Sequence, residues 1–351
     1  AKKWFSIQGE DSLIPILDKI IELGNKDSME HMSIGMQHRG RISVMATLFK
    51  LPYSDVFSYL KQGKVDLNKI TEEINPPGWM QDVLYHYGSE ISINNLKIKL
   101  LDNPSHLELA SPVVNGYLKS IQENLMSDQS NSHDKSISVL THGDSSFAGQ
   151  GIVSELFNMK DLELYNVGGT IHVVVNNQIG FTTNPEESKS EGYCTDIAKA
   201  YNIPVIHVNA DDVESCLKVT SIAYNYRKKF KKDIIIDLIG YRKHGHNEGD
   251  EPSFTQPLMY KKIKNHPSLK TIYTEKLSSE HGDKINTIAH EYFEKWNRKL
   301  EADLENPNIN KSSDISKSII KNNTNIIIDY EYKGTKLKAN EFKSLNHAIF
   351  N

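Results

Sequence analysis

The chain has 351 residues, with 41 basic and 45 acidic side chains and a net charge of −4, which suffices for one large or two average domains with a substantial core. The balanced charge gives no sign of a nucleic-acid partner, and no apolar run approaches the roughly 20 residues needed to cross a bilayer. Two cysteines, Cys194 and Cys216, are too few for a disulfide framework and lack metal-ligand spacing, so we expect a reducing compartment.

The first predicted element is an amphipathic helix that starts near Leu13. Its apolar side chains recur at helical spacing, Asp11 or Ser12 is the expected N-cap, and Gly24 is the expected end. A short strand over residues 31–36 follows. The segment before the helix, AKKWFSIQGE, lacks the apolar core of a signal peptide.

The strand over 31–36 turns at His38 and Arg39 into a second predicted helix. Basic residues at a helix start oppose the helix dipole, so their presence favours a bound anion. A solvated charged turn explains the same residues equally well. The side chains expected to face the core from this helix are Val44, Met45, Leu48 and Phe49.

Residues 53–63 are typical of a short surface helix, and a polar loop runs from there to Met80. Residues 91–101, with Asn94-Asn95 at the centre, predict a β-ribbon that leads to the string NPSHLE. Its histidine, His106, would by itself be a structural residue more often than a catalytic one. A helix over 113–121 and a polar surface loop over 127–135 complete this part.

The centre of the chain has the pattern of a parallel βαβ unit. An apolar strand over 136–141 ends on His142-Gly143-Asp144, a turn around Gly149 opens a helix, and a strand over 171–175 ends on Asn176-Asn177. In open α/β sheets, ligands bind just beyond the carboxyl ends of the strands. Asp144 and Asn177 offer the oxygen ligands that Mg²⁺ takes together with phosphate oxygens. The helix opening near Gly149 offers free N–H groups to a phosphate. We therefore expect a magnesium diphosphate ligand.

Two further strands are predicted over 204–209 and 233–239, on either side of a helix over 213–230 that Asp212 caps. The second strand releases the loop YRKHGHNEGDEP. This loop belongs to the same sheet edge as Asp144, so His246 is a candidate site residue. His142 and His244 are expected to be solvated or to support the site indirectly.

The pattern changes after Tyr260. Residues 283–304 predict one long, charged amphipathic helix, and residues 306–325 are rich in Asn, Ser and Lys, as in a linker. A strand-like run over 326–332 follows. We divide the chain into a diphosphate- and Mg²⁺-binding domain (1–275), a helical arm (276–305) and a polar linker and tail (306–351).

Several strings resemble one known family. Gly-Asp followed about thirty residues later by Asn-Asn is similar to the thiamine-diphosphate motif of transketolase-like enzymes. The strings HRGR, NPSHLE, HGDSSFAGQG, VVVNNQIGFTT and GHNE resemble the decarboxylating component of the 2-oxoglutarate dehydrogenase complex, over roughly residues 2–260. The resemblance implies an α/β fold with a doubly wound, mostly parallel sheet, the diphosphate domain of the transketolase-like fold.

The resemblance also implies roles for individual residues. The cation would be held by Asp144, Asn177 and the backbone carbonyl of Ile179. Ser145 stands where the motif usually has Gly. The cofactor would contact Arg39, Ser105, Asp144, Ser145, Asn177, Ile179 and His246. The substrate would meet His38 and His106, with Ser111 tuning the length of the acid, and His38, His106 and His246 are the implied catalytic residues.

The implied reaction is oxidative decarboxylation of 2-oxoglutarate in the tricarboxylic acid cycle. Thiamine diphosphate and Mg²⁺ are the implied cofactors, and the lipoyl domain of dihydrolipoyl succinyltransferase is the implied acceptor of the succinyl group. A homodimer is expected, in the mitochondrial matrix of a eukaryote or in the cytoplasm otherwise. Two alternatives stay open. One is a 2-oxoadipate dehydrogenase component. The other is a cofactor-binding fragment inactive alone, because the family's activating glutamate lies on a pyrimidine-binding domain that we do not recognise here.

Overall fold

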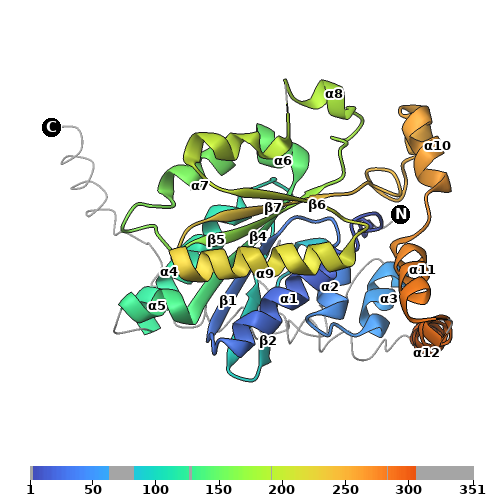
Figure 1. The fold of residues 1–351 in the computed structure, drawn as a ribbon, viewed down its shortest axis with the longest axis horizontal. Helices are drawn as coiled ribbons and strands as arrows, with labels where there is room; N and C mark the ends of the chain where they lie inside the picture. Colours follow the sequence, from blue (N-terminus) through green and yellow to red (C-terminus); the bar gives the residue numbers. More distant parts are fainter. Residues whose placement is uncertain (1–2, 63–82, 126–128, 191, 283, 306–351) are drawn as a thin grey trace, which may run out of the picture.

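A computed structural model describes residues 3–62, 83–125, 129–190, 192–282 and 284–305. Seven strands form one sheet in the order β2-β3-β1-β4-β5-β7-β6, in which β2 runs antiparallel to β3 and the other pairs are parallel (Figure 1). This confirms the expected α/β fold with a mostly parallel sheet. The strands are β1 (His31–Met36), β2 (Ser89–Ile93), β3 (Leu96–Leu100), β4 (Ser136–Gly143), β5 (Thr170–Asn176), β6 (Val205–Asn209) and β7 (Ile234–Ile239).

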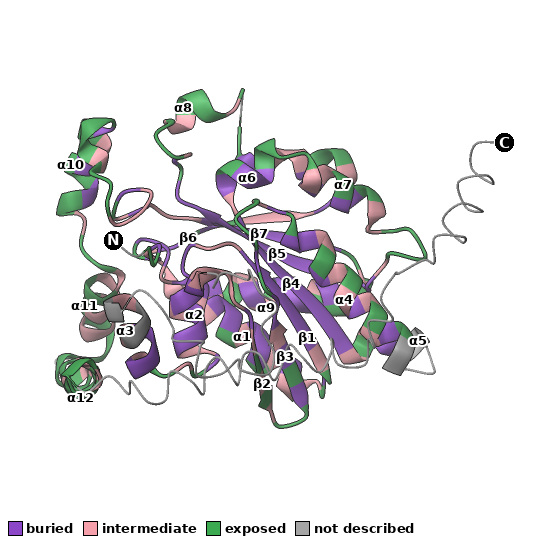
Figure 2. Ribbon diagram, turned by 180° about the vertical axis from the view of Figure 1, so that it is seen from behind, coloured by how far each residue is buried: buried purple, intermediate pink, exposed green. Residues whose placement is uncertain are grey.

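Helices cover both faces of the sheet. On one face, α1 (Leu13–Lys26) and α9 (Val213–Phe230) pack against a large apolar cluster from the central strands. On the other face lie α4 (Ala110–Leu125), α6 (Asp144–Gly149) and α7 (Ile152–Met159). The central strands are therefore buried on both sides (Figure 2), which explains why their sequences are continuous apolar runs rather than alternating ones. The sheet is doubly wound, as expected.

Two details of α1 differ from the sequence prediction. Ser12 stands at the N-cap position, but it is already in a helical conformation and its hydroxyl donates to the carbonyl oxygen of Ala210, at 2.5 Å. Gly24 lies inside the helix, which continues to Lys26, and it faces Leu96 and Met32 in the core. Farther along, the Asp212 cap is confirmed, since its carboxylate accepts the N–H of Ser215.

The polar stretch before β4 is a helix and not the predicted loop. α5 (Gln129–Lys135) buries Ser132, whose carbonyl accepts the hydroxyl of Ser136. A tertiary contact also stabilises α5, because the Arg227 guanidinium donates to the His133 carbonyl at 2.9 Å.

The helix after β1, α2 (Arg41–Thr47), ends before Leu48, which is only partly buried. The remaining helices are α3 (Tyr53–Gln62), η2 (Leu84–His86), α8 (Pro185–Ser188), η3 (Cys194–Tyr201), η4 (Pro252–Phe254), α10 (Pro257–Asn265), α11 (Leu269–His281) and α12 (Lys284–Glu305).

The long helix predicted near the C-terminus is present as α12, which lies beside α11 and α3 (Figure 1). Trp296 of α12 makes an edge contact with Tyr53 of α3, with ring centroids 6.0 Å apart. The boundary drawn after residue 275 falls inside α11. The polar loop before Met80, the linker over 306–325 and the strand-like run over 326–332 lie outside the described residues. None of the described helices has the length and hydropathy needed to cross a membrane.

The topology brings four loops to one edge of the sheet. After β1 the chain forms β2 and β3 on one side of β1, and it then forms β4 on the other side of β1. The direction in which strands are added to the sheet therefore reverses between β1 and β4. At such a point the loops after neighbouring strands diverge and leave a crevice at the carboxyl ends. The loops after β1, β4, β5 and β7 all reach this crevice.

Candidate functional site

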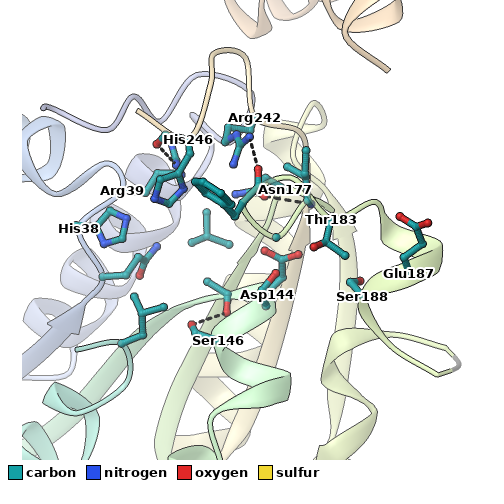
Figure 3. A pocket seen from close by; sticks show the side chains of 18 residues that line it. His38, Arg39, Asp144, Ser146, Asn177, Thr183, Glu187, Ser188, Arg242 and His246 are labelled. Atoms are coloured by element: carbon teal, nitrogen blue, oxygen red, sulfur yellow. Dashed lines mark hydrogen bonds between the residues drawn. The ribbon is translucent and has the colours of Figure 1, made fainter. Parts of the chain in front are cut away.

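A cavity of about 430 Å³ lies at the carboxyl ends of the strands. Figure 3 shows His38, Arg39 and His246 on one side of it, Asp144 and Asn177 near its centre, and Glu187 and Ser188 on the far side. The lining residues are Gln37, His38, Arg39, Leu107, Gly143, Asp144, Ser145, Ser146, Val175, Asn177, Ile179, Gly180, Phe181, Thr183, Glu187, Ser188, Arg242 and His246.

Asp144 is the first residue of α6 and reaches the cavity directly from β4. The residue is 7% exposed, and burial raises the pKa of its carboxyl from 3.8 to about 6. The backbone N–H groups of Asp144 and Ser145 and the charge of Lys189 act against this shift, while Asp237 adds to it. Among the described residues, no side chain donates a hydrogen bond to this carboxylate. A buried carboxylate that faces a cavity without a side-chain donor is suited to a cation.

The turn predicted around Gly149 is present and leads into α7, but it lies away from the cavity. Gly149 ends α6, α7 begins only at Ile152, and a Cβ at Gly149 or Gly151 would meet open space. Both glycines are exposed and neither lines the cavity. The backbone that does line the cavity, from Gly143 to Ser146, is the direct continuation of β4 into α6. Phosphate binding at the Gly149 turn stays a prediction.

The Asn-Asn pair shapes the loop after β5. The side-chain oxygen of Asn176 accepts the N–H of Gln178 at 3.2 Å, and that of Asn177 accepts the N–H of Ile179 at 3.3 Å. Such bonds let an Asn side chain imitate a backbone turn. Gly180 then passes so close to Ser145 that a Cβ on it would lie 2.5 Å from the Ser145 hydroxyl. The loop after β5 is thereby held against the start of α6.

These residues fit a magnesium ion bound with a phosphate. Asp144 supplies one carboxylate and the Asn177 loop supplies amide and carbonyl oxygens, and Mg²⁺ needs one or two protein carboxylates when phosphate and water complete its shell. The described residues hold no group of three or more His, Cys, Asp or Glu residues arranged for a metal. A site completed by ligand oxygens does not require such a group.

Glu10 adds a second buried carboxyl beside this region, and nothing in the sequence marked it. It is 0% exposed, and neither side-chain oxygen has a hydrogen-bond partner of regular geometry. Burial is the largest cause that raises its pKa well above the usual value. Asp144 also raises it, and Arg39 and Asn177 act in the opposite direction. Two poorly compensated carboxyls near Asn177 make this end of the cavity favourable for a positive charge.

The other wall of the cavity is built around two imidazoles. His38, from the turn after β1, lies 6.0 Å from His246 and 4.2 Å from Phe5, measured between ring centroids. Phe181 lies 5.3 Å from His246 on the opposite side. The turn needs Gly40, whose φ of 75° and close contact with Ile7 leave no room for a Cβ.

Both histidines are held neutral at pH 7. Burial, together with the positive charge of Arg39, lowers the pKa of His38 to about 3. Burial also lowers the pKa of His246, with Arg39 and Arg242 acting in the same direction. His38 and His246 are therefore uncharged in the free protein.

Two arginines give this wall its positive charge. The Arg39 guanidinium donates to the carbonyl oxygens of Ser6 (3.1 Å) and His246 (2.8 Å), so it also joins the N-terminal segment to the loop after β7. Arg242 was not predicted from the sequence; it is buried, lines the cavity and donates to the Phe181 carbonyl at 2.9 Å. Its position directly after a predicted strand was the available signal.

Three predicted residues lie outside the cavity lining. His106 is exposed, and Ser105, also exposed, is hydrogen-bonded to Nε2 of His86 at 2.8 Å. Ser111 is buried, but its hydroxyl donates to Glu108 at 3.2 Å. From the NPSHLE segment, Leu107 is the residue that lines the cavity. The structure thus brings together His38, Arg39, Asp144, Ser145, Asn177, Ile179 and His246, but not Ser105, His106 or Ser111.

Comparison with known proteins identifies relatives for most of the chain. Residues 11–312 match the family described as dehydrogenase E1 component. The 2-oxoglutarate dehydrogenase E1 component of Bacillus mycoides (strain KBAB4) is 46% identical over 296 residues, and that of Bacillus cereus (strain B4264) is 47% identical over 298 residues. Each alignment covers 82% of this chain but only 30% of the relative, so the chain spans about a third of the length of the relatives it matches.

Proposed function

Because the chain belongs to the dehydrogenase E1 component family, we propose that the protein carrying it decarboxylates 2-oxoglutarate oxidatively, with thiamine diphosphate and Mg²⁺. The observation that carries this proposal is the cavity itself. It joins a cation-suited carboxylate, Asp144, with the Asn177 loop on one side and two arginines and two neutral imidazoles on the other.

The cofactor would be held mainly at the Asp144 end. We assign the cation to Asp144, Asn177 and the carbonyl of Ile179, and the cofactor's remaining contacts to Ser145, Arg39 and His246. Ser105 keeps its assignment to the cofactor through the resemblance alone. When bound, thiamine diphosphate supplies the carbanion chemistry that the side chains of the protein lack.

The substrate would be held by the other wall. A 2-oxo dicarboxylate carries two negative charges, which Arg39 and Arg242 attract within a partly enclosed cavity. Neutral His38 can donate one hydrogen bond and accept another. A carboxylate beside it favours the imidazolium form and so raises its pKa, which would let it take up a proton as substrate enters. His106 and Ser111 would act from the neighbouring 103–111 segment.

We further propose a wider assembly. The relatives' names describe a component of the 2-oxoglutarate dehydrogenase complex, and the sequence motifs resemble that family. On the strength of that resemblance, the protein would be a homodimer that passes a succinyl group to the lipoyl domain of dihydrolipoyl succinyltransferase in the tricarboxylic acid cycle. It would lie in the mitochondrial matrix of a eukaryote or in the cytoplasm of a bacterium. Residues 1–275 would bind the diphosphate and Mg²⁺, 276–305 would be an arm, and 306–351 would lead to a pyrimidine-binding domain.

The test is turnover of 2-oxo acids by the full-length protein, followed with an artificial electron acceptor that needs no lipoyl partner. We expect the highest kcat/KM for 2-oxoglutarate and a much lower value for pyruvate and for branched-chain 2-oxo acids. A higher kcat/KM for 2-oxoadipate would favour the alternative dehydrogenase. Preference for pyruvate would overturn the assignment.

His106 provides a separate prediction for the substrate wall. In the full-length protein, His106→Ala is expected to lower kcat/KM for 2-oxoglutarate by about 10²-fold, the lower end for a positioned acid–base group, with little change in the Kd of magnesium thiamine diphosphate. Steady-state kinetics and calorimetry measure the two quantities. His281→Ala, a change of an exposed histidine on α11, is the matched control. Equal losses in kcat/KM and cofactor affinity would assign His106 to the cofactor instead.

A further inference from the structure

Glu108 lies in the segment that joins β3 to α4, and its carboxylate is buried, with the residue 8% exposed. One oxygen accepts the hydroxyl of Ser146 at 2.6 Å. The other lies 2.6 Å from Nδ1 of His142 and accepts the hydroxyl of Ser111 at 3.2 Å. His142 and Ser146 flank Asp144 in the chain. Glu108 therefore joins the NPSHLE segment to the strand end that carries the cation-suited carboxylate.

The partners of Glu108 are themselves fixed inside the sheet. Nε2 of His142 lies 3.0 Å from Nδ1 of His172, and Nε2 of His172 lies 3.4 Å from the carboxylate of Asp233, which also accepts the N–H of Thr170 at 2.8 Å. His142 and His172 are both 0% exposed, so His142 is not solvated. A hydrogen-bonded chain buried in this way fixes the orientation of each member.

The backbone at Glu108 indicates that these contacts hold it in place. Its φ is +68°, in the left-handed region, which is unfavourable for a residue other than glycine. Such conformations persist where the surroundings determine them. Here the surroundings are the three hydrogen bonds of the side chain and the start of α4, where the N–H of Ser111 donates to the Glu108 carbonyl at 3.0 Å.

The two segments that Glu108 joins are held differently. Asp144 follows β4, which is paired with strands on both sides, and the buried Phe147 anchors α6 beneath it. The 103–109 segment is tied at its start by the N–H of Asn103, which donates to the His86 carbonyl at 2.8 Å. Further along, Pro104, Ser105 and His106 are exposed. Loss of the Glu108 contacts would therefore release the 103–109 segment rather than the strand end.

We propose that Glu108 is a positioning residue that locks the 103–109 segment onto the β4–α6 junction. This sets the spacing between the substrate side of the cavity, with Leu107 and the adjacent His106, and the cation side at Asp144. The expected effect on KM rests on the proposed function, but the expected effect on the mobility of the 103–109 segment does not. It also explains how Ser111, outside the cavity, can affect the site, because its hydroxyl acts on Glu108.

The chemistry of the contacts allows a conservative test. In Glu108→Gln, the amide nitrogen can stand where the oxygen facing His142 stood, donating to Nδ1 of His142, while the amide oxygen accepts the Ser146 hydroxyl. His142 then carries its proton on Nε2 and donates to His172. The Ser111 hydroxyl, which in wild type donates to the oxygen facing His142, would instead accept the second N–H of the amide. The three contacts can then form without the charge. Glu108→Ala removes them and leaves the buried donors unsatisfied.

The first measurement is hydrogen exchange of the full-length protein without ligands. We expect Glu108→Ala to speed amide exchange of the 103–109 segment at least tenfold and to leave β4 unchanged, and Glu108→Gln to stay within about threefold of wild type. Glu123→Gln, a change of an exposed carboxylate on α4, is the control. Unchanged exchange in Glu108→Ala, or equal effects of Ala and Gln, would overturn the proposal.

The second measurement separates positioning from general support of the fold. In the full-length protein, Glu108→Ala is expected to raise KM for 2-oxoglutarate at least tenfold, with the Kd of magnesium thiamine diphosphate within threefold of wild type, and Glu108→Gln to recover most of the loss. Equal losses in both quantities contradict the proposal. If Glu108→Ala does not fold, Ser146→Ala removes one contact, and no faster exchange at 103–109 would contradict it. If wild type turns over no 2-oxo acid, the proposed function fails while the exchange data still decide the role of Glu108.

Discussion

Asp144→Asn is expected to weaken magnesium-dependent binding of thiamine diphosphate by at least about 100-fold, because the dianionic end of the cofactor needs a cation and the cation loses its one carboxylate. Calorimetric titration of the cofactor with and without Mg²⁺ measures the effect. Asp18→Asn, at an exposed position on α1, is the control. Binding that is unchanged in Asp144→Asn and still magnesium-dependent would refute the assignment of the cation.

The same substitution is expected to stabilise the protein without ligands at pH 7. The carboxyl titrates at about 6 in the folded state and near 3.9 when unfolded. The carboxyl thus has a higher pKa in the folded state than in the unfolded state. Its contribution to the free energy of unfolding is fully present below the unfolded-state pKa and is lost as the pH rises through the folded-state pKa. The difference of about 2 units corresponds to about 3 kcal/mol of unfolding free energy lost between about pH 4 and pH 7. Denaturant unfolding at several pH values without Mg²⁺ would show this loss in wild type and a smaller one in Asp144→Asn.

The second large effect is on the decarboxylation activity of residues 1–351 when they are produced as a separate protein. We expect this chain to bind magnesium thiamine diphosphate weakly and to decarboxylate no 2-oxo acid. Its cavity has the proposed cation end and substrate wall, but the described residues form a single sheet. The family resemblance implies that the activating glutamate belongs to a second domain. Correct orientation of reacting groups can supply about 7–11 kcal/mol of a barrier, so half of a site would be slower by several orders of magnitude.

An assay of decarboxylation with an artificial electron acceptor tests this directly. Addition of the remaining part of the full-length protein, in the same chain or as a separate one, is expected to restore activity. The control is the full-length protein at the same concentration. Rapid turnover by residues 1–351 alone would mean that the activating acid lies within this chain, and Glu10, buried beside Asn177, would then be the first residue to replace.

The sequence was sufficient to predict those elements whose residue pattern follows from one physical rule. Strands β4 and β5 are buried on both faces, so each is a continuous apolar run, and their ends placed Asp144 and Asn177 correctly. α5 could not be predicted, because QSNSHDK has no apolar period and its helix depends on tertiary contacts such as Arg227 with the His133 carbonyl.

Buried charge was the other limit of the sequence analysis. A glutamate before a helix is usually exposed, so nothing distinguished Glu10 or Glu108 from surface carboxylates. Both are buried by residues distant in sequence. For the same reason, a string such as NPSHLE indicates a role shared with a family but does not indicate which of its side chains face the cavity. In this structure the side chain that lines the cavity is that of Leu107 and not that of His106.

Asp144 and Asn177 follow directly on two hydrogen-bonded neighbouring strands, β4 and β5. Parallel strands lie about 4.8 Å apart in every sheet, so the backbone separation of these two oxygen donors is set by β-sheet geometry and not by the 160–169 loop between them. Insertions or deletions in that loop can therefore accumulate during evolution without altering the distance between these two residues. The spacing of the two motifs along the sequence is free to drift, while their spacing in three dimensions is not.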